Sequence, residues 1–376
     1  MRLLCLKENE IGETRVALIP AEVKKLIQLG LAVSVESGAG AAAGLADAVY
    51  AAAGASVGGD RAGLLREAEV VLKVRPLMVG EIGVLKKGVL SVSFLDPFRQ
   101  QELTRAFAAS GALAVSLEMI PRSTLAQKMD ALSSQASLAG YAAVILAAAK
   151  LDRIFPMMMT PAGTLTAAKV LIVGVGVAGL QAIATARRLG ARVTAFDTRP
   201  VVEEQVKSLG AKFLKIDLGE TGQTAQGYAK ELSPEQIELQ KKGMARACAD
   251  SDVVITTAQV FGRPAPRIIN KEMLAGMRAG SLVLDLAVAT GGNVEGSSAD
   301  GEVVTDGGAR VLGCPNLPAT VPFHASQMLS SNLLAFITHF WDKEAGRLRT
   351  DAEDEILRGC LLTKDGAIVH PALRQS

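Results

Sequence analysis

The stretch VLIVGVGVAGLQA, residues 170–182, decides the fold. It begins as a β-branched apolar run, passes through a glycine-rich turn and continues as a helical pattern that Gly190 ends. Gly174, Gly176 and Gly179 have the G-x-G-x-x-G spacing, with a strand before them and a helix after them. This order is typical of the first turn of a dinucleotide-binding βαβ unit. The alternative is an ordinary strand-to-helix turn of an α/β protein.

The residues of this turn have separate expected roles. Gly174 permits the tight turn, Gly176 lets the backbone approach a pyrophosphate, and Gly179 lets the helix pack closely on the strand. Val177 and Ala178 fall in the first helical turn, where free N–H groups and the helix dipole favour phosphate. The turn therefore predicts an anion site at the start of a helix.

The end of the next strand indicates which dinucleotide binds. Asp197 lies 23 residues after Gly174, where a carboxylate accepts hydrogen bonds from the adenosine ribose, and Thr198 and Arg199 follow it. A 2′-phosphate beside Asp197 would meet a like charge, at a cost on the order of 1–4 kcal/mol. Arg199 is the counterargument, since an arginine here can accommodate a 2′-phosphate. We expect NAD(H) to be preferred, and we note that Asp197 can also be purely structural.

Composition limits the remaining possibilities. With 376 residues the chain is long enough for two domains, and 40 basic against 38 acidic residues give no field that would hold nucleic acid. The four cysteines lie far apart without a C-x-x-C pair, so we expect a reducing compartment and no metal site. The N-terminus lacks the apolar core of a secretion signal.

Alternating strand and helix patterns indicate the fold class. Short apolar runs alternate with helical stretches through the first third of the chain, from residue 3 to residue 119, and a second α/β block begins at Lys169. We predict an α/β protein of two Rossmann-like, doubly wound parallel-sheet domains linked by long helices. The expected boundaries are residues 1–132 plus 317–376 for a discontinuous N-terminal domain and residues 133–316 for the NAD(H)-binding domain.

Two apolar stretches are candidates for membrane spans. Residues 136–149 are too few to cross a hydrocarbon core of roughly 30 Å. Residues 170–186 contain the glycine turn and so indicate a strand, a turn and a helix. We therefore expect no direct membrane insertion.

Four segments together resemble a known family. GVGVAGLQAIATARRLGA, PRSTLAQKMDALSSQASLAGYAAV, FPMMMTPAGT and DGAIVHPAL look like the NAD(H)-binding domain I of proton-translocating nicotinamide nucleotide transhydrogenase, and the resemblance extends over the whole chain. It implies that NAD(H) bound here exchanges hydride with NADP(H) on a partner subunit, while a transmembrane subunit moves protons. It also implies a homodimer and a cytoplasmic location, peripheral on the inner face of the plasma membrane. The chain stops at Ser376, so a separately encoded subunit is expected.

The resemblance assigns further site residues. Arg122, Gln127, Asp130 and Ser133 correspond to residues that surround the nicotinamide in domain I. Arg122 and Asp130 can form an ion pair, while the other two can hydrogen-bond the carboxamide or ribose. Tyr228 corresponds to a tyrosine of a mobile loop, here expected within residues 218–242, that closes over the nucleotide. The alternatives are a solvated loop that leads into a helix and a tyrosine packed on the surface.

Alanine dehydrogenase shares this ancestry and is the competing prediction. Its keto-acid lysine and arginine correspond to Lys73 and Arg15, but Phe94 stands where its histidine would be, and a phenyl ring cannot move protons. We expect Arg15 to pair with an acidic neighbour. His324, His339 and His370 are distant in sequence, and we expect capping or surface roles for them. A non-catalytic NAD-sensing protein is the third hypothesis.

Overall fold

The computed structural model describes residues 1–222, 229–351 and 353–374. It divides the chain into two compact units, each with its own sheet. Unit 1 comprises Met1–Gln135 and Ala319–Ser376, and unit 2 comprises Ala136–Pro318. The chain leaves unit 1 within the long helix α6 (Ala131–Lys150) and returns within the short helix η6 (Leu317–Thr320).

Unit 1 is built on an eight-stranded sheet with the order β19-β18-β6-β5-β4-β1-β2-β3. The six strands from β3 to β6 are parallel, while β18 runs antiparallel to β6 and β19 antiparallel to β18. The strands are β1 (Arg2–Cys5), β2 (Ala32–Glu36), β3 (Ser56–Gly58), β4 (Val70–Leu72), β5 (Leu90–Ser93), β6 (Leu113–Ser116), β18 (Leu361–Lys364) and β19 (Ala367–Ile368).

Helices cover both faces of this sheet because successive strand residues point to opposite sides. Leu3 and Cys5 belong to one buried cluster, and Leu4 and Leu6 belong to another. The first cluster is completed by α1 (Pro20–Gln28), α2 (Asp47–Ala52), α11 (Pro322–Phe340) and α12 (Glu355–Cys360). The second is completed by α3 (Arg61–Glu67), α4 (Val79–Ile82) and α5 (Gln101–Ser110).

Unit 2 repeats this plan with a seven-stranded sheet in the order β11-β10-β9-β12-β13-β15-β14, of which only β14 is antiparallel to its neighbour. Its strands are β9 (Lys169–Val173), β10 (Arg192–Phe196), β11 (Lys212–Phe213), β12 (Val253–Thr256), β13 (Leu282–Asp285), β14 (Glu302–Val304) and β15 (Arg310–Gly313). α6, α7 (Val177–Arg188) and α8 (Glu203–Ser208) pack on one face, and α9 (Pro234–Ala249) and α10 (Lys271–Ala275) on the other.

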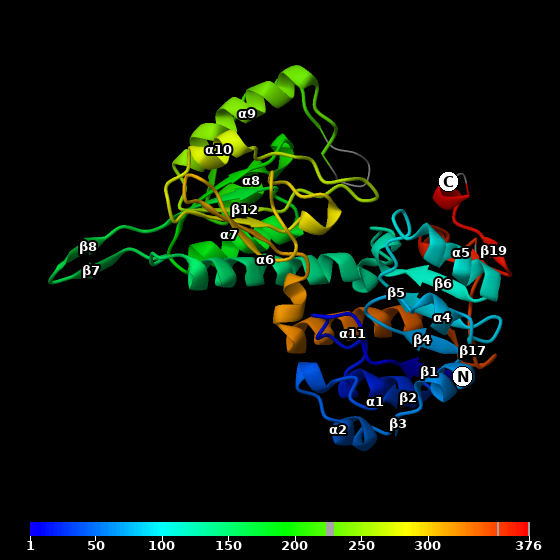
Figure 1. The fold of residues 1–376 in the computed structure, drawn as a ribbon. Coiled ribbons are helices and arrows are strands. Elements are labelled where there is room, and N and C mark those ends of the chain that lie inside the picture. Colours follow the sequence, from blue (N-terminus) through cyan, green and yellow to red (C-terminus); the bar gives the residue numbers. More distant parts are fainter. Residues whose placement is uncertain (223–228, 352, 375–376) are drawn as a thin grey trace. The chain divides into compact units, whose positions relative to one another are not determined.

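The predicted fold class, two doubly wound sheets, is confirmed, with corrections at the edges. The sheets are not purely parallel, because β14, β18 and β19 add antiparallel edge strands. Unit 2 also carries a hairpin of β7 (Met158–Thr160) and β8 (Gly163–Leu165), which projects from the rest of the unit as a narrow ribbon (Figure 1). A small hairpin of β16 (Trp341–Asp342) and β17 (Arg347–Leu348) lies in unit 1.

Helix α6 is longer than the apolar stretch of residues 136–149. Its 20 residues are long and apolar enough to cross a membrane by length and composition, and it is the one such helix among the described residues. A buried helix of a globular core passes the same test, and Ala142, Ala143, Val144 and Ala147 of α6 lie in the core of unit 2.

Candidate dinucleotide-binding site

The glycine turn has the geometry that its sequence predicts. Gly174 follows β9 with a φ of 94°, a left-handed conformation that favours glycine. A Cβ on Gly179 would lie 1.9 Å from the carbonyl oxygen of Gly174, so only glycine lets α7 approach β9 this closely. Gly190 follows the helix with a φ of 86°, as a glycine C-cap requires.

Gly176 differs from the other two because nothing crowds it. It is exposed and extended, with a φ of −86°, and a Cβ there would meet no heavy atom within 4 Å. It is also the N-cap residue of α7, and no side chain caps the helix at this position. No side chain at the N-cap therefore takes up the first-turn N–H groups of α7, and such groups at a helix N-terminus favour an anion.

Residues that the sequence did not single out complete the floor of this site. The Thr257 hydroxyl donates to the carbonyl of Gly174 at 3.0 Å, from the segment after β12. Asn293 in turn holds that segment, accepting from the N–H of Ala258 at 3.0 Å and donating to its carbonyl at 2.8 Å. Strand order reverses between β9 and β12, and ligands of doubly wound sheets bind at such switch points. Only the folded sheet reveals these partners.

Asp197 lies at the end of β10 with both carboxylate oxygens in use. Oδ2 accepts from the N–H of Val175 at 2.8 Å, which ties the carboxylate to the glycine turn. Arg199 donates to Oδ1 through its backbone N–H and its Nε, both at 2.9 Å, and to Oδ2 through a terminal nitrogen at 2.8 Å. The two side chains are 7% and 14% exposed. Thr198 between them is half-buried.

This ion pair changes the electrostatic argument about NADP(H). The expected repulsion assumed an unpaired carboxylate, whereas the Asp197–Arg199 pair carries no net charge. Hydrogen bonding to Asp197 is the main cause that raises the pKa of Arg199, so the guanidinium stays charged. Discrimination against a 2′-phosphate therefore depends on where Arg199 lies when the dinucleotide is bound.

A buried aspartate organises the next loop of the same edge. Asp285 at the end of β13 is fully buried and accepts from the N–H groups of Ala287, Asn293 and Val294, and from the Ser297 hydroxyl at 2.7 Å. Because so many donors compensate its charge, this carboxylate has a structural role: it fixes the loop that carries Asn293.

In unit 1, the segment that precedes α6 carries the other predicted site residues. Arg122 and Gln127 are exposed, with Gln127 at the start of the short helix η3 (Gln127–Met129). Asp130 and Ser133 are in direct contact, because Asp130 accepts from the Ser133 N–H at 2.8 Å and from its hydroxyl at 2.6 Å.

Asp130 does not form the ion pair with Arg122 that the sequence permits. Asp130 stands immediately before α6, and the contacts of its carboxylate with the described residues are both with Ser133. The reason is that the first N–H groups of a helix need an acceptor, which an aspartate at this position supplies.

Helix α11 holds this segment in place. Asn332 donates to the carbonyl of Lys128 at 2.8 Å and accepts from the Ser134 hydroxyl at 2.7 Å. Gln135 donates to the carbonyl of Ala325 at 3.0 Å. Arg122 and Gln127 thus extend from an anchored segment, which is what an orienting role requires.

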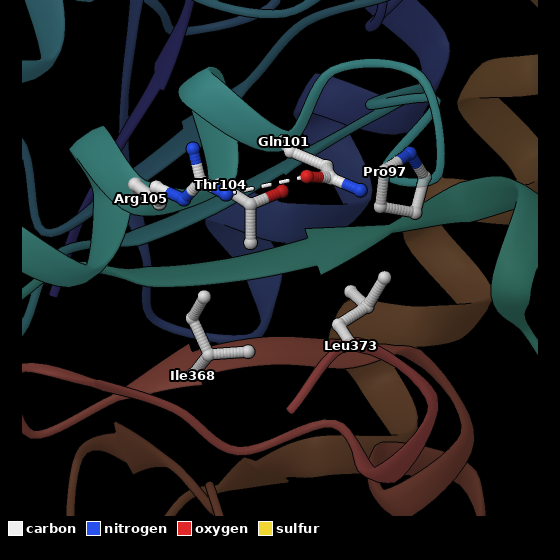
Figure 2. A pocket seen from close by; sticks show the side chains of 6 residues that line it. All are labelled: Pro97, Gln101, Thr104, Arg105, Ile368 and Leu373. Atoms are coloured by element: carbon white, nitrogen blue, oxygen red, sulfur yellow. Dashed lines mark hydrogen bonds between the residues drawn. The ribbon is translucent and has the colours of Figure 1, made fainter. Parts of the chain in front are cut away.

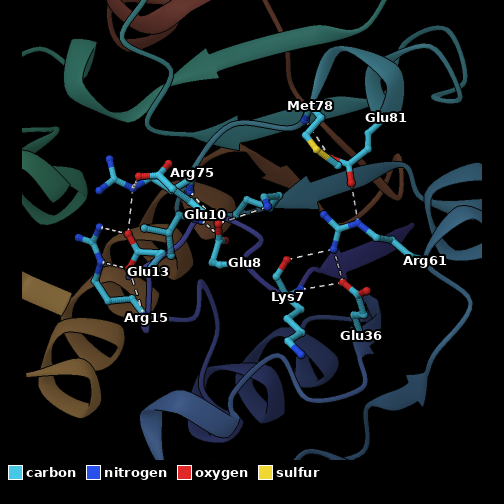
Figure 3. A network of polar contacts seen from close by, with 12 residues as sticks. Lys7, Glu8, Glu10, Glu13, Arg15, Glu36, Arg61, Arg75, Met78 and Glu81 are labelled. Atoms are coloured by element: carbon cyan, nitrogen blue, oxygen red, sulfur yellow. Dashed lines mark hydrogen bonds and ion pairs between the residues drawn. The ribbon is translucent and has the colours of Figure 1, made fainter. Parts of the chain in front are cut away.

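A charge network occupies the switch point of the unit 1 sheet, between β1 and β4 (Figure 3). Lys73 contacts Glu8 at 3.2 Å, and each side chain is 3% exposed. Burial raises the pKa of Glu8, and the charge of Lys73 opposes that shift. The guanidinium of Arg15 makes two hydrogen bonds to Glu13, of 2.7 and 2.6 Å, which confirms the predicted pairing with an acidic neighbour.

Glu13 is the most strongly shifted carboxylate of this network. Burial raises its pKa, but hydrogen bonds and charge from Arg15, with further charge from Arg75, outweigh burial and bring it to about 2. Every one of these cations has a carboxylate partner, so the network is internally balanced.

Phe94 follows β5 beside this network. Its N–H donates to the carbonyl of Val74, the residue after Lys73, and its ring packs against the core of unit 1. Among the histidines, His370 confirms a capping role by accepting from the N–H of Ala372, and His324 is exposed. His339 is half-buried and packs edge-on against Phe340 at 4.7 Å.

Other candidate sites are weaker. The pocket of Figure 2 has an interior of about 10 Å³, room for a single water, and is lined by Pro97, Gln101, Thr104, Arg105, Ile368 and Leu373. An open hollow of about 640 Å³ lies beside α8 and is lined by Pro200, Val201, Glu203, Glu204, Lys207 and Lys215. Over the described residues, no three His, Cys, Asp or Glu side chains group as metal ligands would. Tyr228 lies outside the described residues.

Family models match nearly the whole chain. The alanine dehydrogenase/PNT N-terminal domain matches residues 4–139, and the alanine dehydrogenase/PNT C-terminal domain matches residues 143–371. The first part of the NAD(P) transhydrogenase subunit alpha of Rhodospirillum rubrum is 44% identical, with 99% of both chains covered. The NAD(P) transhydrogenase subunit alpha of Cereibacter sphaeroides is 41% identical over 99% of this chain and 71% of its own length.

Among solved structures, too, a transhydrogenase is more similar to this chain than an alanine dehydrogenase is. A transhydrogenase from Sinorhizobium meliloti superimposes with a TM-score of 0.85 and 42% identity, covering 99% of this chain and 100% of its own. An L-alanine dehydrogenase superimposes with a TM-score of 0.81 but 27% identity, over 100% and 98% of the two chains. The chain therefore belongs to the alanine dehydrogenase/PNT family, and within it resembles the NAD(P) transhydrogenase alpha subunits more closely than the alanine dehydrogenases.

Proposed function

We propose that this chain is the NAD(H)-binding subunit of a proton-translocating transhydrogenase, which exchanges hydride with NADP(H) held by a partner subunit. The observation that carries the proposal is the Gly174–Gly179 turn, crowded at two glycines and open at Gly176, in a chain that matches a transhydrogenase subunit over 99% of its length. The nicotinamide, when bound, supplies the hydride chemistry, and the chain supplies binding and orientation.

In this proposal the pyrophosphate lies against the backbone of Gly176, Val177 and Ala178, at the N-terminus of α7. Asp197 receives the adenosine ribose, with Thr198 and Arg199 beside it. Tyr228 is retained as a contact on the resemblance alone. These residues set the affinity and choice of dinucleotide.

The segment before α6 is proposed to orient the nicotinamide. Asp130 and Ser133 fix where the helix begins, through their two mutual hydrogen bonds. Arg122 and Gln127 are exposed and can hydrogen-bond a ligand, with Gln127 offering both a donor and an acceptor to a carboxamide. Hydride transfer requires the donor and acceptor carbons within about 3–3.5 Å, so orientation contributes more than acid or base groups.

The charge network argues against an amino-acid dehydrogenase. A keto-acid substrate needs an available cation and a group that moves protons, but Lys73 is buried against Glu8, and Arg15 is paired with Glu13. Phe94, beside Lys73 on the neighbouring strand end, has no titratable group. Neither cation is therefore available to a keto acid, and the residue at the position of the histidine cannot move protons.

The proposal includes three partners: a second copy of this chain, an NADP(H)-binding subunit and a transmembrane subunit. The Rhodospirillum rubrum relative is named as one part of an alpha subunit, which supports an assembly of several chains. Tyr141 and Ile145, one turn apart on α6 and 40% and 39% exposed, offer apolar area for a homodimer, as do Met158 and Met159 on the projecting hairpin. We place the chain in the cytoplasm, held at the inner face of the plasma membrane by its partners.

One titration separates the proposal from alanine dehydrogenase. NADH fluorescence is recorded as the purified protein is added, and pyruvate with ammonium follows in the same cuvette. We expect a fluorescence change on adding protein and no later loss of NADH. Steady consumption of NADH would make the chain an amino-acid dehydrogenase, and the absence of any spectral change would remove the dinucleotide site.

Two substitutions test whether Arg122 and Gln127 orient the nicotinamide. Arg122→Ala and Gln127→Ala should slow hydride exchange in the reconstituted complex by at least tenfold, about 1.4 kcal/mol of transition-state stabilisation, and change NADH affinity much less. Lys128→Ala is the matched control, since Lys128 is an exposed neighbour on the same segment. Equal losses in rate and affinity would contradict an orienting role.

A further inference from the structure

The carboxylate of Asp197 has no acceptor site left over. A carboxylate offers about four lone-pair positions. Oδ1 accepts from the N–H and Nε of Arg199, while Oδ2 accepts from the Val175 N–H and a terminal nitrogen of Arg199. Three of the four donors therefore belong to Arg199, and two of these belong to its side chain.

An adenosine ribose needs the same oxygens. Its 2′- and 3′-hydroxyls present two adjacent donors to the acidic residue at the end of the second strand. The Nε and terminal N–H groups of a guanidinium also form a pair of adjacent donors, and here they engage both oxygens of Asp197. Arg199 and the ribose diol thus compete for one edge of one carboxylate.

We propose that Arg199 is a specificity-determining residue that NAD(H) must displace from Asp197, so that its ion pair lowers dinucleotide affinity. The inference rests on the proposed function, since it takes the Gly174 turn as the NAD(H) site. It reverses the usual expectation for a cation in a dinucleotide site, namely that removing it weakens binding.

The surroundings of the pair make its displacement costly but feasible. The side chains of Asp197 and Arg199 are only 7% and 14% exposed, so the ion pair is poorly screened. A terminal nitrogen of Arg199 also donates to the carbonyl of Val175 at 3.1 Å, which extends the guanidinium over the glycine turn. The hollow beside α8 begins at Pro200, the next residue, and has room for a long side chain.

The same competition affects the choice between NAD(H) and NADP(H). A 2′-phosphate replaces one ribose donor with a dianion that attracts Arg199 and is repelled by Asp197. Removing the guanidinium leaves that repulsion uncompensated. Arg199→Ala should therefore tighten the binding of NADH and weaken the binding of NADPH.

The test measures Kd by fluorescence titration for NADH and NADPH, with AMP and reduced nicotinamide mononucleotide as competing or direct ligands. Arg199→Ala should lower the Kd of NADH and of AMP about fivefold and raise that of NADPH about fivefold, each about 1 kcal/mol. The mononucleotide lacks the adenosine ribose, so its Kd should stay unchanged. Arg188→Ala is the matched control, because it removes an exposed cation from the end of α7.

Each outcome decides between the alternatives. Weaker NADH binding by Arg199→Ala would overturn the inference and make Arg199 a direct contact, and so would an equal effect on the mononucleotide. Arg199→Lys keeps the charge without the two-pronged geometry and should shift NADH in the same direction by a smaller factor, which provides the test if the alanine variant does not fold. If the unaltered protein binds no NADH, the proposed function fails and this inference with it.

Discussion

Gly176 and Gly179 lie three residues apart in one turn, yet substituting each with alanine should have opposite consequences. At Gly179 the new Cβ would lie 1.9 Å from the Gly174 carbonyl oxygen, while real Cβ contacts essentially never fall under 3.0 Å. Helix α7 would have to move by about 1 Å, and overpacking of this kind costs roughly 1–3 kcal/mol or more. We expect Gly179→Ala to lower Tm by about 5–10 °C, at about 2–4 °C per kcal/mol for a unit of this size.

Gly176→Ala should leave the fold intact. The residue is extended, and a Cβ meets nothing within 4 Å, so the change should be neutral or should stabilise by up to about 1 kcal/mol through the unfolded chain. The methyl group would, however, stand where the pyrophosphate approaches. Losing one charge-assisted backbone hydrogen bond costs about 1.5–3 kcal/mol, so the Kd of NADH should rise roughly 10- to 150-fold.

Thermal melting and NADH titration of the two variants and the unaltered protein form the assay. Gly176→Ala should bind NADH more weakly at an unchanged Tm, whereas the main effect of Gly179→Ala should be a lower Tm. Unchanged NADH affinity in a folded Gly176→Ala variant would refute the assignment of this turn as the pyrophosphate site.

Two further predictions concern unit 1. Asp130→Ala removes the acceptor of the Ser133 N–H and should lower the free energy of unfolding by about 1 kcal/mol. Asp130→Asn keeps an acceptor oxygen and should retain most of that stability. If chemical denaturation shows the alanine variant to be as stable as the unaltered protein, the capping role is contradicted. Glu13 has a folded pKa of about 2 against an ordinary value of 4.5, so its ion pairs contribute stability above pH 4.5 that is lost as the pH falls toward 2. The difference in unfolding free energy between the unaltered protein and Glu13→Gln should shrink by up to about 3 kcal/mol over that range, and a pH-independent difference would contradict the assigned pKa.

Local sequence patterns predicted the central elements well. The apolar runs that became β9, β12 and β13 are buried on both faces over nearly their whole length, which gives a continuous apolar pattern in the sequence. The antiparallel edge strands β14 and β19 have three and two residues, too few for any periodicity to show, and only their neighbours in the sheet fix their direction. The β7–β8 hairpin is exposed throughout and so lacks the alternation of a half-buried strand.

The candidate site was predictable where its partners are close in sequence. The glycine spacing and the acidic residue after β10 identified the turn and its carboxylate. Thr257 and Asn293 contact the turn or its supporting segment from 83 and 35 residues away, so no local pattern could reveal them. The sequence identified both Asp197 and Arg199. It could not show that Arg199 donates to the carboxylate of Asp197, because those hydrogen bonds depend on the backbone path between the two residues.

The most direct test of the proposed role follows hydride between two nucleotides. The purified chain is mixed with NADH and with a transhydrogenase NADP(H)-binding subunit loaded with thio-NADP⁺, and formation of the reduced analogue is recorded by stopped-flow absorbance. We expect rapid reduction only when both proteins are present, and none from NADH with either protein alone. Absence of transfer in the mixture, with NADH bound to this chain, would contradict the assignment as a transhydrogenase subunit.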